Sequence, residues 1–534
     1  MSRLAPGVLA FWAAVYLAVW YRITFSTYPG FWLVDEEMAV HSLGHAVYLD
    51  NWLAAGHGHA NSFFQFLHPG LPLQMFSWLA YRLTASDPLA SAEELFQATL
   101  IGPEPFHLAT QCLGMATILL GLFLIWRQLR PAGGLASFVA LALPFACAGN
   151  WAVGFWRLDS ETFALVLAAG YAACLAMAFG EAPGGKPRKL GWFWLGMILG
   201  AAYLNKVSHI PWFVGAGAGW LAWLMASRGG WRAALSSAVS VLAGGFVSGC
   251  IGLVLMGPRQ FYQMLHLHWR IATHRGVIGE GTAGLVDQRG IVLPTDPAVY
   301  LAAGLVLLIC LGFWVKRSRA DWLAKQAPMG AALGTALLAG LLVLLRQQWD
   351  HYFSPTAALM PFAAFWLFRA IDKRLAYLLL LAPLAAIGPI ENSLQRADAR
   401  PALAGERLAE IDEFLSLGLE DGQIRIWSFK VQSPHYLRRL AVEQSGARHL
   451  TVIVDQLQPN DFDFNIWKKM MRRIDSWHQP DDFAWRYAIF ERRYFKRPAD
   501  LPESFRKPGY RIVERKHHIW VERPPSLFSQ LSAG

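Results

Sequence analysis

Three consecutive acids, Asp35, Glu36 and Glu37, directly follow the first apolar run of the chain. Charged side chains are costly to hold at a membrane unless water, a partner or a reaction uses them. We therefore interpret Asp35 and Glu36 as candidate catalytic acids in a polar cavity at the membrane surface, where a carboxylate can act as a general base. The alternative is structural, because acids that precede the helix predicted over residues 38–53 would stabilise its N-terminus.

A metal site is a second interpretation of the same stretch. Glu37, His41 and His45 are spaced four residues apart, so they share one face of the predicted helix. Such a face could hold a divalent ion, Mg, Mn or Zn. The alternative is a polar stripe that faces water or lipid headgroups, and nothing completes a recognised zinc signature. We predict no obligatory cofactor and leave a divalent metal open.

A second acid lies in the sequence FWRLDSET, residues 155–162. Asp159 is a candidate second active-site acid, and Arg157 beside it is a candidate substrate-binding residue. The alternative for Asp159 is an N-cap, because aspartate before an apolar run often begins a helix.

The richest cationic stretch is residues 266–284, HLHWRIATHRGVIGEGTAG. Its basic residues recur at helical spacing and are followed by glycines, whose backbone can approach an anion closely. We predict that this stretch binds a phosphate group; the alternative is a basic interfacial helix. Lys206 and Arg346 are further candidates, or anchors that reach toward the headgroups. The predicted donor-phosphate residues are thus Lys206, Arg270, His274, Arg275 and Arg346.

Composition indicates the elements that must position these residues. The 534 residues are 55% hydrophobic and only 16% charged, with a mean hydropathy of +0.31, whereas soluble proteins carry about 25% charged residues. The apolar residues form long blocks, which predicts an integral membrane protein with an uncleaved first span. The net charge of +10 suits cytoplasmic loops and anionic lipid, so we expect no nucleic-acid partner. The five cysteines lie in apolar blocks, which predicts no disulfide framework.

The positive-inside rule orients the predicted spans. With residue 1 in the cytoplasm, the basic loops all fall on the cytoplasmic side, provided that residues 68–83 form a short juxtamembrane helix rather than a span. The acids and cations above, and the C-terminus, are then outside. The eleven predicted spans are residues 7–27, 106–126, 131–150, 160–180, 190–205, 209–227, 233–256, 297–315, 328–345, 355–370 and 375–391.

The chain changes character near residue 392. We predict two domains: a transmembrane catalytic module over 1–391, with a first outer loop at 28–105, and an extracytoplasmic α/β domain over 392–534. Alternation of β-branched and aromatic residues predicts strands in this domain. They lie at 423–429, 449–455, 483–491, 510–515 and 518–523, with helices at 405–419 and 433–444.

The order and sidedness of these motifs resemble the GT-C superfamily of polyprenyl-phosphate-sugar glycosyltransferases, which includes protein O-mannosyltransferases and lipid A aminoarabinose transferases (families 39 and 83). The residues that carry the resemblance are Asp35-Glu36, the turn His68-Pro69-Gly70-Leu71-Pro72, Arg157-Leu158-Asp159, Asn205-Lys206, the segment from His274 to Gly281, and Arg346 to Tyr352. Relatives often have a second proline where Gly70 stands. The tail after residue 391 has no recognised counterpart.

The resemblance implies a multi-span helical fold and an inverting transfer of sugar from a polyprenyl phosphate, such as undecaprenyl phosphate, to an acceptor hydroxyl. The family's first-loop acid would be Asp35 or Glu36, and its second acid Asp159. The substrate-binding candidates are Arg157, His68, Asp350, His351 and Tyr352. Membrane lipids are expected partners, the acceptor is open, and a bacterial inner (plasma) membrane with an extracytoplasmic active site is the expected location. The alternatives are an oligosaccharide ligase with a lipid-diphosphate donor, and a non-enzymatic transporter or scaffold.

Overall fold

Two compact units make up the chain in the computed structural model, and each is described by itself. The helical unit comprises Met1–Thr24, Leu67–Phe76 and Thr110–Arg396, and the C-terminal unit comprises Phe25–Phe66, Ser77–Ala109 and Ala397–Gly534. The structure describes residues 5–27, 46, 49–50, 53, 70–85, 87, 99, 104–156, 158–180, 189–227, 230–258, 261–262, 264–266, 286–287, 290–291, 295–344, 350–415, 463–465, 470–473, 476–478, 487–492, 496–501 and 503–524.

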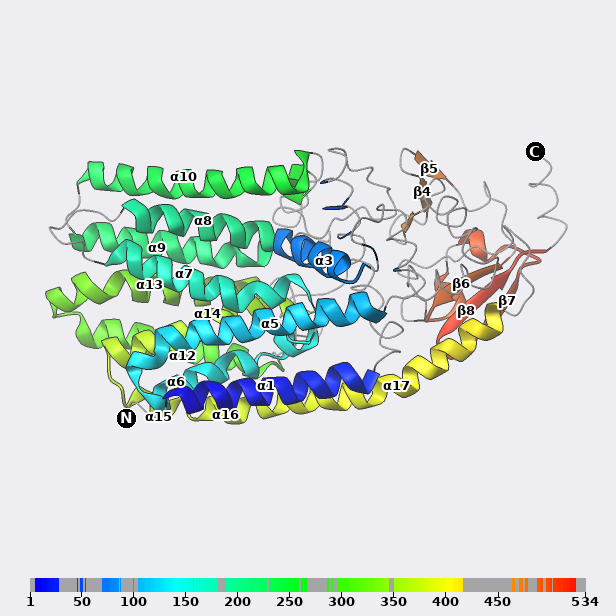
Figure 1. Cartoon of the computed structure of the whole chain (residues 1–534), viewed down its shortest axis with the longest axis horizontal. Helices are drawn as coiled ribbons and strands as arrows, with labels where there is room; N and C mark the ends of the chain where they lie inside the picture. The colour runs from blue at the N-terminus through cyan, green and yellow to red at the C-terminus, as the bar shows by residue number, and fades with distance from the viewer. Residues whose placement is uncertain are drawn as a thin grey trace. The chain divides into compact units, whose positions relative to one another are not determined.

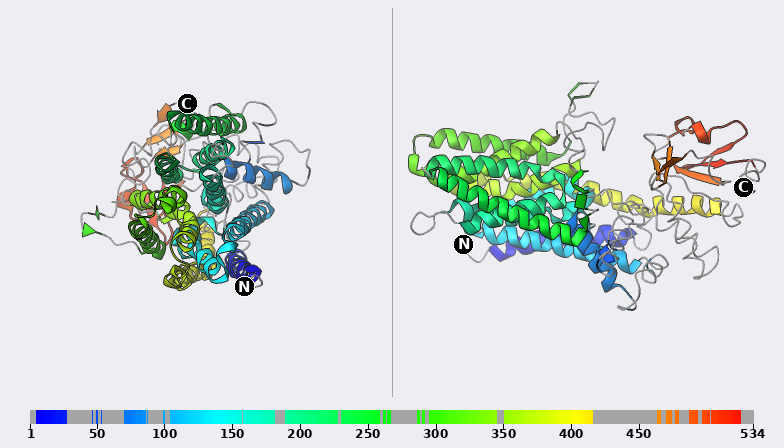
Figure 2. Two further views of the ribbon diagram at one scale, coloured as in Figure 1. Left: turned by 90° about the vertical axis from the view of Figure 1, so that its left-hand side faces the viewer. Right: turned by 90° about the horizontal axis from the view of Figure 1, so that it is seen from above.

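Long apolar helices form the helical unit. They run side by side as a bundle in Figure 1 and are seen end-on in the left view of Figure 2. Ten of the eleven predicted spans coincide with helices, although the last one is divided into α15, α16 and α17. The span predicted at 131–150 differs, because α6 covers only nine of its residues and is followed by short helical turns. The helices are α1 (Ala5–Thr27), α3 (Leu71–Leu83), α5 (Glu104–Leu129), α6 (Gly134–Ala142), α7 (Ala164–Phe179), α8 (Lys189–Asn205), α9 (Ile210–Ser227), α10 (Trp231–Met256), α12 (Pro297–Lys316), α13 (Ala320–Leu344), α14 (Ser354–Ala370), α15 (Leu375–Leu378), α16 (Leu381–Ala385) and α17 (Ile387–Leu415).

Among the described residues, seven helical segments are long and apolar enough to cross a membrane by length and composition. They are Pro6–Phe25, Glu104–Ala132, Ser160–Phe179, Trp231–Met256, Pro297–Lys316, Ala320–Leu344 and Leu375–Leu403. The prediction of a multi-span integral membrane protein is therefore confirmed. The 13 residues of α3 span only about 20 Å at 1.5 Å per residue, so α3 is too short to cross, as predicted for residues 68–83.

Helix α8 packs closely against α10, and α9 packs closely against α13. Small residues at these interfaces allow the backbones to approach. A Cβ added at Gly196 of α8 would overlap the backbone oxygen of Val241, and one added at Gly244 of α10 would overlap that of Phe193. Lipid offers no hydrophobic gain for pairing two apolar helices, so close backbone packing of this kind supplies much of the attraction.

Gly244→Ala is accordingly expected to lower the thermal stability of the purified protein, because the added methyl group must push α10 away from α8. Overpacking of this kind costs about 1–3 kcal/mol. The matched control is Gly249→Ala on the same helix, where an added Cβ meets nothing within 4 Å and alanine has the better helix propensity. Equal unfolding temperatures of the two variants would contradict this packing.

The segment before α7 is fixed by α1. The Trp12 indole N–H donates to the carbonyl of Phe138 at 3.0 Å, and the Tyr16 hydroxyl donates to that of Phe155 at 2.7 Å. Both side chains are buried. A buried hydrogen bond to a backbone carbonyl fixes an irregular segment that has few backbone partners of its own. The Tyr16 bond therefore positions the irregular stretch at Phe155 ahead of α7, and the Trp12 bond holds α6, the helix before that stretch.

Two small antiparallel sheets lie in the C-terminal unit. Strands β3 (Asp463–Asn465), β4 (Met470–Arg473) and β5 (Ser476–His478) form one, in sequence order. In the other, β8 (His518–Glu522) lies between β6 (Tyr487–Glu491) and β7 (Arg511–Glu514). The strands predicted at 510–515 and 518–523 are confirmed, and the strand predicted at 483–491 is confirmed over residues 487–491; its residues 483–486 lie outside the described residues. The strands predicted at 423–429 and 449–455 and the helix at 433–444 lie outside the described residues.

Helix α17 runs without interruption from Ile387 to Leu415, across residue 392, so the domain boundary there stays a prediction. Its polar end contacts the turn between β7 and β8. Lys516 Nζ lies 2.6 Å from Glu406, His517 Nε2 lies 2.8 Å from the same carboxylate, and His518 Nδ1 lies 2.8 Å from Glu410. Arg515 pairs with Glu413 one turn further along. These acids share one helix face, which fastens the hairpin to α17.

This contact is expected to weaken in acid. Burial alone would raise the pKa of Glu410, but hydrogen bonds from His518 and the His517 backbone hold that pKa below its usual value of 4.5. Bonds from Lys516 and His517 likewise lower the pKa of Glu406. A carboxyl with a depressed pKa stabilises the folded state above its unfolded pKa, and that stability is lost as the pH falls through the folded pKa. The protection factors of the β7 and β8 amides, which correct the exchange rate for its intrinsic pH dependence, should therefore fall below pH 4.5.

The same exchange measurement tests the contact at neutral pH with a variant. Glu410→Gln should accelerate exchange in β7 and β8, because the amide cannot replace the charged acceptor that His518 uses. Glu503→Gln, an acid elsewhere in the C-terminal unit, is the control and should leave it unchanged. Unchanged exchange in Glu410→Gln would contradict the role given to this helix face.

Candidate functional site

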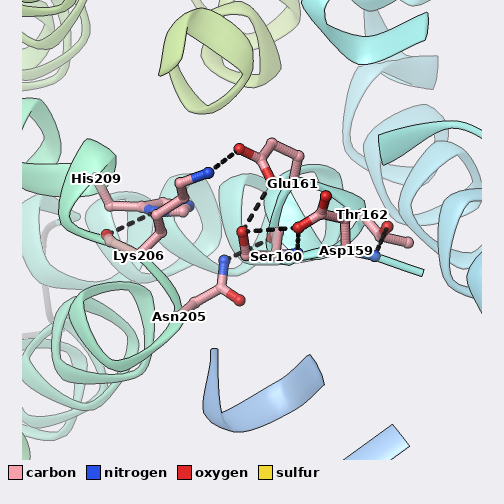
Figure 3. Close-up of polar contacts among 7 residues, drawn as sticks. All are labelled: Asp159, Ser160, Glu161, Thr162, Asn205, Lys206 and His209. Atoms are coloured by element: carbon pink, nitrogen blue, oxygen red, sulfur yellow. Dashed lines mark hydrogen bonds and ion pairs between the residues drawn. The ribbon is translucent and has the colours of Figure 1, made fainter. Parts of the chain in front are cut away.

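The start of α7 is a tight polar turn, drawn in Figure 3. Asp159 has an extended backbone and precedes the short helix η7 (Ser160–Phe163). Its carboxylate accepts from the Ser160 backbone N–H at 2.6 Å, and its own N–H donates to Thr162 Oγ1 at 2.9 Å. Asp159 is therefore the N-cap of this turn, with a reciprocal capping box.

Glu161, two residues further, points away from the cap and forms an ion pair with Lys206 (Figure 3). Both side chains are almost completely buried. Ser160 Oγ donates a second hydrogen bond to the Glu161 carboxylate at 2.7 Å. Lys206 Nζ also lies 5.0 Å from the centre of the Tyr352 ring, where the ring face attracts a cation. The pair therefore has no net charge and several additional contacts.

The junction between α8 and α9 presents Lys206 to this pair. The backbone of Lys206 is extended and ends α8, and η8 (Val207–His209) leads into α9. Asn205 Nδ2 donates to the Ser160 carbonyl at 2.8 Å, and His209 Nδ1 lies 3.1 Å from the Lys206 carbonyl. The Asn205 bond holds the junction against η7, and the His209 bond stabilises the turn within the junction. Lys206 is thereby placed beside Glu161.

A third segment, η9 (Asp350–Phe353), leads into α14 and contributes Tyr352. Trp212 on α9 donates from its indole to the Pro355 carbonyl at 3.2 Å, and the Tyr171 hydroxyl donates to the Trp212 carbonyl at 2.9 Å. The starts of α7, α9 and α14 thus meet. We define Asp159, Ser160, Glu161, Asn205, Lys206, His209 and Tyr352 as the polar cluster.

The comparisons with known proteins bear on the fold. No protein-family model matches the sequence, and no curated protein matches it. The apo oligosaccharyltransferase of Archaeoglobus fulgidus aligns with 95% of this chain and 73% of its own, at a TM-score of 0.51 and 11% identity. The chain has the fold of this enzyme. The expectation of a GT-C fold is therefore confirmed.

Two further structures align over nearly the whole chain. ArnT from Cupriavidus metallidurans in the apo state covers 98% of this chain and 99% of its own, at a TM-score of 0.47 and 14% identity. The second is the Archaeoglobus fulgidus oligosaccharyltransferase AglB in complex with an inhibitory peptide and a dolichol-phosphate. It covers 98% of this chain and 74% of its own, at a TM-score of 0.48 and 12% identity.

In this GT-C fold the structure brings three of the predicted site residues together: Asp159, Lys206 and Tyr352. Asp350 and His351 belong to η9, next to the cluster in the chain. The other predicted site residues lie outside the described residues: Asp35, Glu36, Glu37, His41, His45, His68, Arg157, Arg270, His274, Arg275 and Arg346. Their assignments stay predictions.

Metal ligands were predicted only at Glu37, His41 and His45. In the part of the chain that the structure describes, no three His, Cys, Asp or Glu side chains are grouped to hold a metal ion. The structure therefore offers no test of the predicted ligands themselves.

The sequence analysis did not select Ser160, Glu161, Asn205 or His209 as site residues, and Glu161 is the most important of these because it is the counterion of Lys206. A signal for it was present, because a lysine placed between two apolar helices requires a buried counterion. The acids of FWRLDSET were the nearest candidates on the same predicted face. Chemically, the cluster provides a fixed neutral ion pair with buried hydrogen-bonding groups on either side, which suits recognition of a polar, uncharged group.

Proposed function

We propose that this protein is an inverting membrane glycosyltransferase that moves a sugar from a polyprenyl-phosphate donor to an acceptor hydroxyl on the extracytoplasmic face. The observation that carries this proposal is the meeting of three helix starts, with their buried acid, cation and hydroxyl groups, at one place in a fold shared with an oligosaccharyltransferase. The sequence places the acidic first outer loop on the same predicted face.

The chemistry needs one base and a stabilised leaving group. The acceptor oxygen attacks the anomeric carbon, the bond between that carbon and the phosphate oxygen breaks, and the polyprenyl phosphate leaves with the electron pair. Asp35, or Glu36 beside it, takes the hydroxyl proton. Arg270, His274, Arg275 and Arg346 stabilise the departing phosphate. Attack from the opposite side inverts the anomeric centre without the paired carboxylates of glycoside hydrolysis.

A second candidate is an oligosaccharide ligase with a lipid-diphosphate donor. The fold shared with the archaeal oligosaccharyltransferase favours it. The two candidates differ in the size of the transferred group and in the number of phosphates on the carrier. The extracytoplasmic C-terminal domain that we propose over residues 392–534 could receive the acceptor in either case.

Donor turnover tests the proposal. Purified full-length protein is incubated with radiolabelled polyprenyl-phosphate sugars and, separately, with a diphosphate-linked oligosaccharide. We expect release of lipid phosphate from one monophosphate donor. Release only from the diphosphate donor would favour the ligase. Loss of turnover with a chelator would support Glu37, His41 and His45 as metal ligands, and no turnover of any donor would overturn both candidates.

A further inference from the structure

Two buried side chains of the polar cluster each use one polar atom in the fold and leave the other without a partner. Asn205 has no exposed surface and His209 is 1% exposed. Among the described residues, Asn205 Oδ1, His209 Nε2 and the hydroxyl of Ser208 between them have no hydrogen-bond partner. All three lie on the segment that carries Lys206. A buried polar atom without a partner costs about 1–3 kcal/mol, so three on one short segment indicate a role outside the fold.

Their existing bonds determine what these free atoms are. The Lys206 carbonyl can only accept, so His209 Nδ1, 3.1 Å away, carries the proton and Nε2 has a free lone pair. Asn205 Nδ2 donates to the Ser160 carbonyl, which identifies Oδ1 as the remaining atom, again an acceptor. The segment therefore presents two acceptors, Asn205 Oδ1 and His209 Nε2, whose missing partners are donors, and the Ser208 hydroxyl, which can donate or accept.

The charge of the surroundings narrows the ligand further. Lys206 is neutralised by Glu161, and Asp159 adds a second buried acid near the same lysine, so the cluster has no unbalanced cation that would attract an anion. A phosphodiester, as in a sugar linked through phosphate to a polyprenol, is ionised and has no O–H to donate. A sugar ring, in contrast, is covered with hydroxyl donors. The segment is thus matched to the sugar of such a donor and mismatched to its phosphate.

We propose that Asn205 Oδ1 and His209 Nε2 form a subsite that accepts hydrogen bonds from hydroxyl groups of the donor sugar, while Lys206 positions the segment through Glu161. This inference rests on the proposed function, which supplies the sugar-bearing lipid. It changes the role of Lys206 from the phosphate binding predicted from the sequence to a positioning role. The donor phosphate is then bound by the other predicted cations, which lie outside the described residues: Arg270, His274, Arg275 and Arg346.

The test compares a lipid phosphate with and without its sugar. Binding of farnesyl phosphate and of farnesyl-phosphate-linked glucose, mannose and aminoarabinose to the detergent-solubilised full chain is measured for wild type, His209→Asn and His209→Gln. The asparagine amide can still donate to the Lys206 carbonyl but does not reach the position of Nε2, whereas glutamine reaches it. Thermal unfolding of each variant reports whether the fold is kept.

We expect His209→Asn to bind one sugar-bearing lipid about tenfold more weakly, the loss of one hydrogen bond, and to bind farnesyl phosphate as wild type does. His209→Gln should recover most of the loss. An equal loss for farnesyl phosphate, or no loss for any sugar-bearing lipid, would overturn the inference. If both variants unfold, Asn205→Ala, assayed in the same way, must show the sugar-dependent loss; otherwise the inference fails.

Binding and turnover separate this inference from the proposed function. If wild type binds a sugar-bearing lipid more tightly than farnesyl phosphate but transfers no sugar, the proposed function fails and the subsite stands. If wild type binds the two equally, the subsite is overturned whether or not transfer occurs. A series of donors that lack one hydroxyl each then identifies the partner, because removing the correct hydroxyl abolishes the difference between wild type and His209→Asn.

Discussion

Sugar transfer is expected to fall by about 10²–10⁴-fold, the usual contribution of a general base, when Asp35 is replaced by asparagine and Glu36 by glutamine in one variant. Each amide keeps the shape of the acid but cannot take the proton from an acceptor hydroxyl. Donor binding should be nearly unchanged, because the phosphate and the sugar are held elsewhere. The effect should therefore appear in kcat and not in the donor Kd, measured by transfer kinetics and by direct binding.

The first outer loop provides a matched control for this variant. Glu93 and Glu94 lie in the same predicted loop and are also adjacent acids, so Glu93→Gln with Glu94→Gln removes the same charge from the same predicted face. This control should retain transfer. If the two double variants lose activity equally, the loss reflects the loop's charge, and Asp35 and Glu36 are not the base.

Lys206→Met is expected to destabilise the protein strongly. Among the described residues, it leaves the buried Glu161 carboxylate with Ser160 Oγ, at 2.7 Å, as its side-chain donor. Breaking a buried pair from one side costs about 3–5 kcal/mol. The double variant Glu161→Gln, Lys206→Met removes both charges and should recover a large part of that stability. Thermal unfolding in detergent measures the stability of wild type, of Lys206→Met and of the double variant.

An exposed ion pair is the control for this comparison of single and double variants. Arg492 and Glu514 lie 3.4 Å apart with side chains 33% and 47% exposed, and such pairs contribute about 0–1 kcal/mol. Glu514→Gln should therefore have little effect on unfolding. A double variant no more stable than Lys206→Met would show that Glu161 and Lys206 act independently, contrary to the buried pair.

The spans were predictable because a helix that crosses the hydrocarbon core of a membrane needs a long run of apolar residues, and such runs can be read directly from the sequence. The end of the last span was less predictable. Charged residues begin near residue 392, yet α17 continues to Leu415, because a helix satisfies its own backbone hydrogen bonds on either side of a membrane boundary. Strands β4 and β5 carry Lys- and Arg-rich neighbours without alternation, so no pattern of period two revealed them.

The candidate site was predictable in its location and less so in its pairings. The turn 155–162, the junction 204–209 and the segment before α14 were predicted to share one face, and the structure brings Asp159, Lys206 and Tyr352 together there. Which acid faces Lys206 depends on the geometry of η7, which turns Glu161 toward the lysine and leaves Asp159 as the cap. A difference of two residues in one turn decides this, and residue types do not encode it.

The buried ion pair also has a consequence for biosynthesis. Glu161 precedes α7 and Lys206 follows α8, so the pair closes the open end of one helical hairpin. A lone charge at the centre of a membrane helix costs about 2.5–3.5 kcal/mol on insertion scales. Glu161 and Lys206 lie at helix ends, so each would carry a part of that cost if its helix entered the bilayer alone. Because the partners neutralise one another only when both helices are present, the translocon should release α7 and α8 into lipid together, as a preassembled pair.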